Sequence, residues 1–290
     1  MFEQFEPGRI QTSEAEIAYL RGGTGPPVLL LHGYPQTHVM WHRVAPVLAE
    51  RFTVVCTDLR GHGDSSKPDG GYRQAAYAKA VMALDQIEVM EALGFDRFHL
   101  VGHDRGARVA HRLALDHPDR VSRLALLDIV PISAVMETLT RESAMSVYHW
   151  FFLVQPYDLP ERLVGADPSF YLRWHLRSWS GDEHLSFVTD EAMEAYERAF
   201  SDPRAIHTTM EDIRALMAID YEAELADRGK RTFSCPLLVL WGARGKSGDI
   251  AAAWREWATD VRGHGLGCGH FLAEERPEET AALLMEFLAE

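Results

Sequence analysis

A carboxylate followed by guanidinium groups is the first feature of this chain that could do chemistry. The segment VGHDRGARVAHR, residues 101–112, places Asp104 between two glycines and follows it with Arg105 and Arg108. A displayed carboxylate can attack an electrophilic carbon and form an ester. Nearby guanidinium groups can bind a planar anion through paired hydrogen bonds and offset its repulsion by the nucleophile. The residue types therefore indicate nucleophilic attack by Asp104 on a small anionic molecule.

The residues around Asp104 predict how it is displayed. Residues 98–101 read as a short buried strand, and residues 107–115 read as a helix. Gly102 and Gly106 would allow a tight strand-to-helix turn that lifts the side chain between them above the end of a sheet. This pattern resembles the nucleophile elbow, G-x-nucleophile-x-G, of α/β-hydrolases. The plainer alternative is a surface turn in which the aspartate caps the helix.

Two further residues complete a candidate catalytic triad. His270 lies in the segment CGHF before the last expected helix, and Asp128 ends the apolar segment LALLD. Nucleophile, acid and then histidine is a chain order found in α/β-hydrolases. Asp249, after a later strand, is the rival acid. The usual place for an acid shortly after LWG holds Gly245, so we expect Asp128 to be the acid.

The segment LLLHGYPQTHVMW indicates an oxyanion site. A His-Gly-x-Pro turn after a buried strand is typical of the loop that directs a backbone N–H at a developing oxyanion. We expect the N–H groups of Tyr34 and Arg105 to be the two donors. The later segment DLRGHGDSSKP, residues 58–68, is a common scaffold loop of the same superfamily. We expect a structural role for it despite its His62 and Asp64.

An alternation of strand and helix patterns predicts the fold class. It indicates an α/β fold with a mostly parallel sheet covered by helices on both faces. Residues 73–93 and 278–288 read as helices. The aromatic-rich segment 132–231 lacks strand patterns and is expected to be a helical cap, inserted into an α/β-hydrolase core of residues 1–131 and 232–290. The expected buried strands are residues 28–31, 52–56, 98–101, 124–127 and 237–240.

Composition narrows the classes of partner. The 290 residues carry a formal net charge of −14, which argues against binding nucleic acid or an anionic membrane surface. An anionic substrate would therefore need a local cationic pocket. The sequence has no membrane-span pattern and no secretion-signal pattern, so we expect a cytoplasmic location. The three cysteines lack metal-ligand spacing, so no metal or other cofactor is expected; they are Cys56, Cys235 and Cys268.

Four segments together resemble one family. The elbow, HGYPQTHVMWHR, LALLDIVP and YHWFFLVQP are similar to segments of fluoroacetate dehalogenases, also called haloacetate dehalogenases, and the resemblance extends along nearly the whole chain. It implies that Asp104 displaces halide from a haloacetate and forms an ester. Water activated by His270, which Asp128 orients, would then cleave the ester to give glycolate. The resemblance also implies a homodimer.

The same resemblance implies binding roles. Arg105 and Arg108 would bind the substrate carboxylate. His149 and Trp150, in the motif YHWFF, would donate hydrogen bonds to the departing halide. From the residues alone, aromatic side chains in a helical insert are expected to pack in a core.

One position departs from the family pattern. Ile213, in MEDIRALM, stands where the family has a tyrosine that is its third halide donor, and Tyr221 lies about two helical turns further on. Fluoride is strongly hydrated and leaves a strong bond, so its departure depends on such donors more than that of chloride. We therefore expect activity on chloroacetate and slower release of fluoride.

Three alternative functions share parts of this pattern. Haloalkane dehalogenases use a tryptophan directly after the nucleophile and often an asparagine after His-Gly, whereas this chain has Arg105 and Tyr34 there and contains no asparagine. A non-catalytic ligand-binding protein on the same fold generally lacks a triad member, and none is missing here. Epoxide hydrolases share the Asp-His-Asp triad but need cap tyrosines to protonate the opening oxygen. The candidate tyrosines are Tyr148, Tyr157, Tyr171, Tyr196 and Tyr221.

Overall fold

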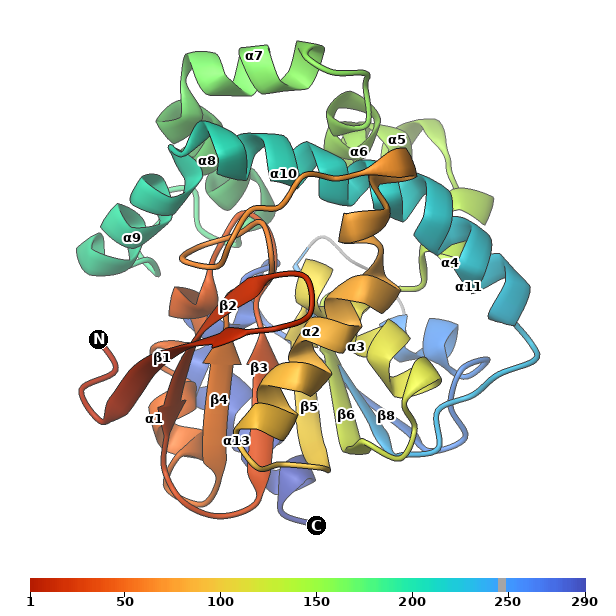
Figure 1. Cartoon of the computed structure of the whole chain (residues 1–290). Coiled ribbons are helices and arrows are strands. Elements are labelled where there is room, and N and C mark those ends of the chain that lie inside the picture. The colour runs from red at the N-terminus through yellow and green to blue at the C-terminus, as the bar shows by residue number, and fades with distance from the viewer. Residues whose placement is uncertain (245–248) are drawn as a thin grey trace.

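The computed structural model of the chain describes residues 1–244 and 249–290. Their strands are β1 (Phe5–Gln11), β2 (Glu16–Gly22), β3 (Pro27–Leu31), β4 (Thr53–Thr57), β5 (Phe98–His103), β6 (Val121–Leu127), β7 (Leu237–Gly242) and β8 (Val261–Leu266). They form one sheet in the order β1-β2-β4-β3-β5-β6-β7-β8 (Figure 1). The first two pairs in this order are antiparallel and the others are parallel. The predicted α/β fold with a mostly parallel sheet is confirmed.

Helices cover both faces of the sheet. They are α1 (Ala45–Leu48), α2 (Lys79–Ala92), α3 (Arg105–Asp116), α12 (Leu272–Glu275) and α13 (Pro277–Leu288), with 3-10 turns η1 (His38–Trp41), η2 (Tyr72–Tyr77) and η4 (Ile250–Trp254). Leu29 and Leu31 of β3 are buried with α2 and α3, in front of the sheet in Figure 1, whereas Val28 and Leu30 are buried with α1 and α13. Successive side chains of a strand point to opposite faces, so an uninterrupted apolar strand needs a helix layer on each side.

The five predicted strands are confirmed, but the sheet has three more. β1 and β8 are its two edges, and β2 joins β1 to β4. The sequence of β1, FEPGRIQ, contains proline and glycine, and that of β8, VRGHGL, contains two glycines. Both residue types are depleted in strands. An edge strand need not be apolar on both faces, so its pattern is weak.

The predicted helix of residues 73–93 begins later than expected. In η2, Arg73 and Gln74 have φ angles of 55° and 59°. These left-handed residues and the extended backbone of Ala78 interrupt the helical path, so α2 starts only at Lys79. The backbone N–H of Lys79 donates to Asp220 Oδ1 at 2.8 Å, which ties the start of α2 to the helices that lie between β6 and β7.

Helices occupy the chain between β6 and β7. They are α4 (Ile132–Glu137), α5 (Arg141–Ser146), α6 (Tyr148–Leu153), α7 (Leu159–Ala166), α8 (Pro168–Trp179), α9 (Asp190–Phe200), α10 (Pro203–Ala215), the π-helical turn η3 (Leu216–Asp220) and α11 (Tyr221–Asp227). Most of them lie above the carboxyl ends of the parallel strands (Figure 1). Their apolar cluster includes Tyr34 and Phe271 from outside this segment. The division into a core and a cap of residues 132–231 stays a prediction, which this placement supports.

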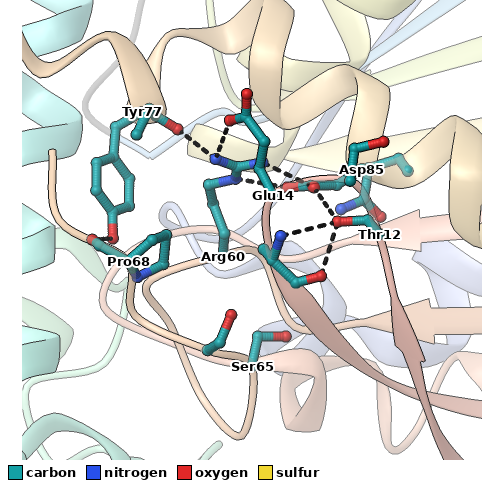
Figure 2. A network of polar contacts seen from close by, with 12 residues as sticks. Thr12, Glu14, Arg60, Ser65, Pro68, Tyr77 and Asp85 are labelled. Carbon is teal, nitrogen blue, oxygen red and sulfur yellow. Dashed lines mark hydrogen bonds and ion pairs between the residues drawn. The ribbon is translucent and has the colours of Figure 1, made fainter. Parts of the chain in front are cut away.

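A buried network holds the loop of residues 58–68 (Figure 2). Arg60 Nε and Nη2 donate to the two carboxylate oxygens of Asp85, in α2, at 2.6 and 2.8 Å. Arg60 Nη1 also contacts Glu14 at 3.3 Å, and Thr12 Oγ1 donates to Asp85 at 2.7 Å. Arg60 and Asp85 are almost fully buried, so the pair fixes the loop against α2. This agrees with the structural role predicted for the loop.

Candidate active site

Asp104 stands at the turn between β5 and α3, with a φ of 46°. The turn is tight on both sides of it. A Cβ atom at Gly102 would lie 2.6 Å from Cα of Ala107, and one at Gly106 would lie 2.4 Å from the carbonyl oxygen of His32. A larger residue at either position would force the turn open, so the two glycines are what allows Asp104 to be displayed.

The two carboxylate oxygens of Asp104 face different groups. Oδ1 accepts a hydrogen bond from the backbone N–H of Tyr34 at 2.8 Å. Oδ2 lies 3.8 Å from Nε2 of His270. On the other side of the imidazole, His270 Nδ1 contacts Asp128 Oδ2 at 2.5 Å, and Asp128 Oδ1 accepts from the backbone N–H of Gly242 at 2.9 Å. The structure therefore brings the three predicted triad residues together in the order Asp104, His270, Asp128.

The surroundings of Asp104 favour its ionised form. Burial alone would raise the pKa of Asp104, but the imidazoles of His270 and His103 and the Arg105 guanidinium together bring it below the ordinary value. His103 also supports the loop of His270: its Nε2 donates to the backbone carbonyl of His270 at 2.8 Å. Burial lowers the pKa of His103 to about 4, so this imidazole is neutral. Sequence analysis missed this contact, because it joins segments far apart in the chain.

The rival acid, Asp249, makes a different contact. Asp249 is exposed, and its carboxylate pairs with Arg255 at 2.6 Å. It is not among the described residues that line the cavity next to Asp104. Gly245, at the place where an acid is usual, lies outside the described residues. The geometry therefore favours Asp128 as the partner of His270.

A cavity of about 480 Å³ opens above Asp104. Its walls include side chains from the sheet side and from α6. The predicted residues among them are Asp104, Arg108, Asp128, His149, Trp150 and His270. Apolar groups form much of the remaining wall, including Val130, Val135 and Val147. The cavity thus combines carboxylates, the guanidinium groups of Arg108 and Arg244, imidazoles and apolar surface.

Trp179, at the end of α8, is a cavity residue that sequence analysis missed. Its ring centroid lies 5.7 Å from that of His270 and 4.6 Å from that of His149. Its backbone carbonyl accepts from His270 N–H at 2.8 Å. The segment FYLRWHLRSW is rich in aromatic residues, so its pattern alone does not distinguish a residue of the cavity wall from one of the apolar core.

Arg108 is a buried cation within the cavity. Its Nη1 is 3.4 Å from the carbonyl oxygen of Val130, and its guanidinium lies 5.1 Å from the centre of the Trp150 ring. No carboxylate of the described residues lies within ion-pair distance of it. Burial lowers the pKa of Arg108, although Asp104 acts in the opposite direction. A buried guanidinium without a paired carboxylate is suited to binding an anionic ligand.

Arg105 is held differently. Its Nη1 donates to the backbone carbonyl of Thr209 at 3.1 Å and to Asp212 Oδ2 at 3.0 Å, both on α10. Its guanidinium also lies 4.3 Å from the centre of the Tyr34 ring. Arg105 is not among the described residues of the cavity wall. Its roles as a carboxylate ligand and, through its backbone N–H, as the second oxyanion donor stay predictions.

His149 and Trp150 both reach the cavity from α6. Burial lowers the pKa of His149 to about 3, so its imidazole is neutral and carries a single N–H. Its Nδ1 is buried and has no hydrogen-bond partner among the described residues. Nε2 is therefore the nitrogen that can face a ligand in the cavity. The predicted hydrogen bond from His149 to halide requires the imidazole proton to be on Nε2.

Ile213 and Tyr221, the two residues tied to a third halide donor, do not line the described cavity wall. Ile213 is buried in the apolar cluster of the helices between β6 and β7, and Tyr221 packs against that cluster. In the described structure, neither places a hydroxyl beside His149 and Trp150. The expected shortage of halide donors stays a prediction.

The candidate tyrosines of an epoxide hydrolase also lie off the described cavity wall. Tyr196 donates to Glu274 at 3.0 Å, and Tyr157 is 72% exposed. The ring of Tyr171 stacks on that of Phe200, away from the described cavity wall. This arrangement offers less support for epoxide opening than for attack on a small anion.

Residues 1–244 and 249–290 contain no group of three or more His, Cys, Asp or Glu side chains placed to hold a metal ion. In the same part of the chain, no helix is both long and apolar enough to cross a lipid bilayer.

Comparisons with known proteins agree with this geometry. The family model of the α/β hydrolase fold matches residues 26–277. Fluoroacetate dehalogenase from a Burkholderia species is 44% identical over 100% of this chain and 96% of its own length. Soluble epoxide hydrolase from a Corynebacterium species is 34% identical, covering 93% of each chain. The crystal structure of an α/β hydrolase from a Nostoc species superposes with a TM-score of 0.97 at 54% identity, covering 100% of both chains.

The resemblance seen in four sequence segments thus extends over the whole chain. The fold, the elbow and the aspartate-histidine-aspartate arrangement are all those of a hydrolase. The chain therefore belongs to the fluoroacetate or haloacetate dehalogenase family of the α/β-hydrolases.

Proposed function

We propose that this hydrolase removes halide from short 2-haloacids such as chloroacetate and produces glycolate. The observation that carries the proposal is the cavity in which the carboxylate of Asp104 and the unpaired guanidinium of Arg108 face the same space. An anionic substrate needs the cation to approach an anionic nucleophile. The similarity to fluoroacetate dehalogenase supports the same substrate class.

The first step uses the oxygen of Asp104 that is not held by the HGYP loop. Oδ2 attacks the carbon that bears the halogen, a C–O bond forms, and the C–halogen bond breaks with its electron pair on the departing halide. His149 and Trp150 donate hydrogen bonds to the halide as its charge develops. Arg108 and Arg105 hold the substrate carboxylate. The product of this step is an ester on Asp104.

The second step cleaves the ester. His270 Nε2 takes a proton from water while the water oxygen adds to Cγ of Asp104. Asp128, in contact with His270 Nδ1, stabilises the imidazolium that forms. The negative charge develops on Oδ1, which already accepts from Tyr34 N–H. The intermediate then collapses with cleavage of the Cγ–Oδ2 bond, and glycolate leaves with the proton from His270. The remaining proton of the water is lost from Asp104 to solvent, which regenerates the carboxylate.

Halide-release assays on chloroacetate and fluoroacetate, together with an assay of diol formation from styrene oxide, test this proposal. We expect chloride release from chloroacetate and little opening of styrene oxide. Opening of the epoxide without release of halide from either acid would assign the chain to epoxide hydrolysis. No turnover of any of the three, with binding of a haloacetate retained, would indicate a non-catalytic ligand-binding protein.

We also propose that the protein is a cytoplasmic homodimer that needs no cofactor. Large apolar side chains are exposed on α5, α6, α7 and α8, which is consistent with a covered surface. They include Met145, Tyr148, Leu163, Phe170 and Trp174. Light scattering coupled to size-exclusion chromatography should give twice the chain mass of 32.7 kDa. A mass of one chain at micromolar concentration would contradict the dimer.

A further inference from the structure

A buried carboxylate that contacts Arg105 has no role in the two catalytic steps proposed above. Asp212, on α10, is almost fully buried. It accepts hydrogen bonds from Arg105 Nη1 at 3.0 Å and from Lys79 Nζ, and His62 Nε2 lies 3.7 Å away. These three side chains come from the start of α3, the start of α2 and the loop of residues 58–68. Asp212 thus links α10 to the start of α3, to the start of α2 and to the loop of residues 58–68.

The surroundings of Asp212 favour its ionised form. Burial alone would raise the pKa of its carboxyl, but Lys79 and Arg105 hold the pKa well below the usual range. Asp212 is also held by Lys79, and Arg105 is also held by the carbonyl of Thr209. A buried ion pair whose two partners make such further contacts favours one geometry of the guanidinium over others.

Within the described residues, the guanidinium of Arg105 is hydrogen-bonded through Nη1 only. Its other edge, Nε and Nη2, has no hydrogen-bond partner among the described residues and is called the open edge below. Nη1 is held by Asp212 and by the carbonyl of Thr209, and the plane lies against the ring of Tyr34. A guanidinium fork binds a carboxylate through two parallel N–H groups, so the angle at which the open edge is presented determines how the ligand lies.

We propose that Asp212 is a positioning residue that sets the angle at which Arg105 presents its open edge to the substrate carboxylate. The inference rests on the proposed function. Because Asp212 balances the charge of Arg105, the buried cation of the cavity wall that attracts the anion is Arg108. Loss of Asp212 should therefore disturb the orientation of the substrate more than its attraction to the site.

Asp212→Asn tests this division of roles, because it keeps the side-chain shape and removes the charge. We expect kcat for chloroacetate to fall at least about 10-fold, since small displacements from the attack geometry cost this much or more. We expect KM for chloroacetate and the inhibition constant of acetate, an unreactive carboxylate, to stay within about 3-fold of the parent.

Asp220→Asn is the matched control. Asp220 is a similarly buried aspartate that contacts the same Lys79, and no hydrogen bond or ion pair joins it to Arg105 in the described structure. The same amide substitution there should leave kcat within about 3-fold. Thermal unfolding of each variant shows whether it is folded.

If Asp212→Asn does not fold, Asp212→Glu takes its place, because it keeps the charge opposite Lys79 and moves the carboxylate oxygens by one methylene. It should lose kcat at least about 3-fold with KM retained.

The outcomes distinguish failure of the proposed function from failure of the positioning role of Asp212. If the parent releases no halide, the proposed function fails and the role of Asp212 fails with it. If the parent is active, the positioning role alone is overturned by a folded Asp212→Asn with kcat within 3-fold of the parent. It is also overturned if Asp220→Asn loses as much kcat as Asp212→Asn, or if Asp212→Glu keeps parental kcat where Asp212→Asn does not fold.

Discussion

Individual side chains at the elbow allow the two chemical steps to be separated. Asp104→Asn should abolish halide release, because the amide is a poor nucleophile. His270→Asn should still form the ester but not hydrolyse it, because the base acts only in the second step. Mass spectrometry of the His270 variant after incubation with chloroacetate should show an adduct on the Asp104 peptide. An adduct on another residue would falsify the mechanism.

The two arginines should be sensitive to a change that keeps their charge. Lysine cannot reproduce the fork that binds a carboxylate through two hydrogen bonds, and each charge-assisted bond contributes about 1.5 to 3 kcal/mol. Arg108→Lys should raise KM for chloroacetate at least about 10-fold, because Arg108 is a buried cation of the cavity without a carboxylate partner among the described residues. Arg105→Lys should mainly lower kcat. Steady-state kinetics of both variants checks this, and near-parental values in both would remove the arginines from substrate binding.

Ile213 bears on the choice between fluoride and chloride. Ile213→Tyr would add a hydroxyl to α10 and should raise kcat/KM for fluoroacetate relative to chloroacetate, because fluoride needs hydrogen-bond donors more. The position is buried, so the larger ring also carries a packing cost of about 1 to 3 kcal/mol. Ile213→Phe is the control, since it adds the ring without the hydroxyl. An equal change of the ratio in both variants, or a parent that already prefers fluoroacetate, would contradict the donor argument.

At the scale of elements, the loop of residues 58–68 depends on its pair with α2. Asp85→Asn would leave the Arg60 guanidinium buried opposite an amide (Figure 2). Removing one partner of a buried ion pair typically costs about 3 to 5 kcal/mol. Urea unfolding should show a loss of this order. Asp96→Asn, at an exposed carboxylate 3.7 Å from Arg120, should change stability by less than about 0.5 kcal/mol, as a surface ion pair does. Equal effects of the two substitutions would show that the loop does not depend on the pair.

For the whole molecule, buried histidines predict loss of stability in mild acid. Their pKa values are lowered by burial, so the unfolded chain binds protons more tightly than the folded one. Their contribution is complete above the unfolded pKa of about 6.5 and is lost as the pH falls toward their folded values. The residues are His32, His99, His103, His111 and His175, with pKa values of about 4, and His149, with about 3.

The free energy of unfolding should therefore fall from pH 7 to pH 5. Three groups act in the opposite direction, because the folded chain binds their protons more tightly: burial raises the pKa of Glu274 to about 8 and also raises that of Asp220, and the Asp58 carboxylate outweighs burial and raises that of His38. They are three groups against these six histidines with large shifts, so the net slope should follow the histidines. Urea titrations at pH 7, 6 and 5 measure the slope, and constant or rising stability on acidification would show that these imidazoles are not neutral in the folded chain.

Local patterns in the sequence were enough for the fold class, the elbow and the candidate triad. Apolar strands of four or five residues and the glycines beside Asp104 act over one or two turns of backbone, so the sequence carries their signal directly. The edge strands β1 and β8 were missed, and the start of α2 was wrong, because their residues have weak local preferences. The packing of neighbouring elements decides those boundaries.

The residue types that could attack, accept a proton and bind an anion, and their order along the chain, follow from the amino-acid sequence alone. Their contact partners follow only from the folded structure. It placed His270 against Asp128 while Asp249 pairs with Arg255, and it joined Arg105 to Asp212 while leaving Arg108 without a carboxylate partner in the described structure. Such contacts join helices and loops far apart in the chain. Their geometry follows from how the elements pack around the sheet, which no local spacing of residues encodes.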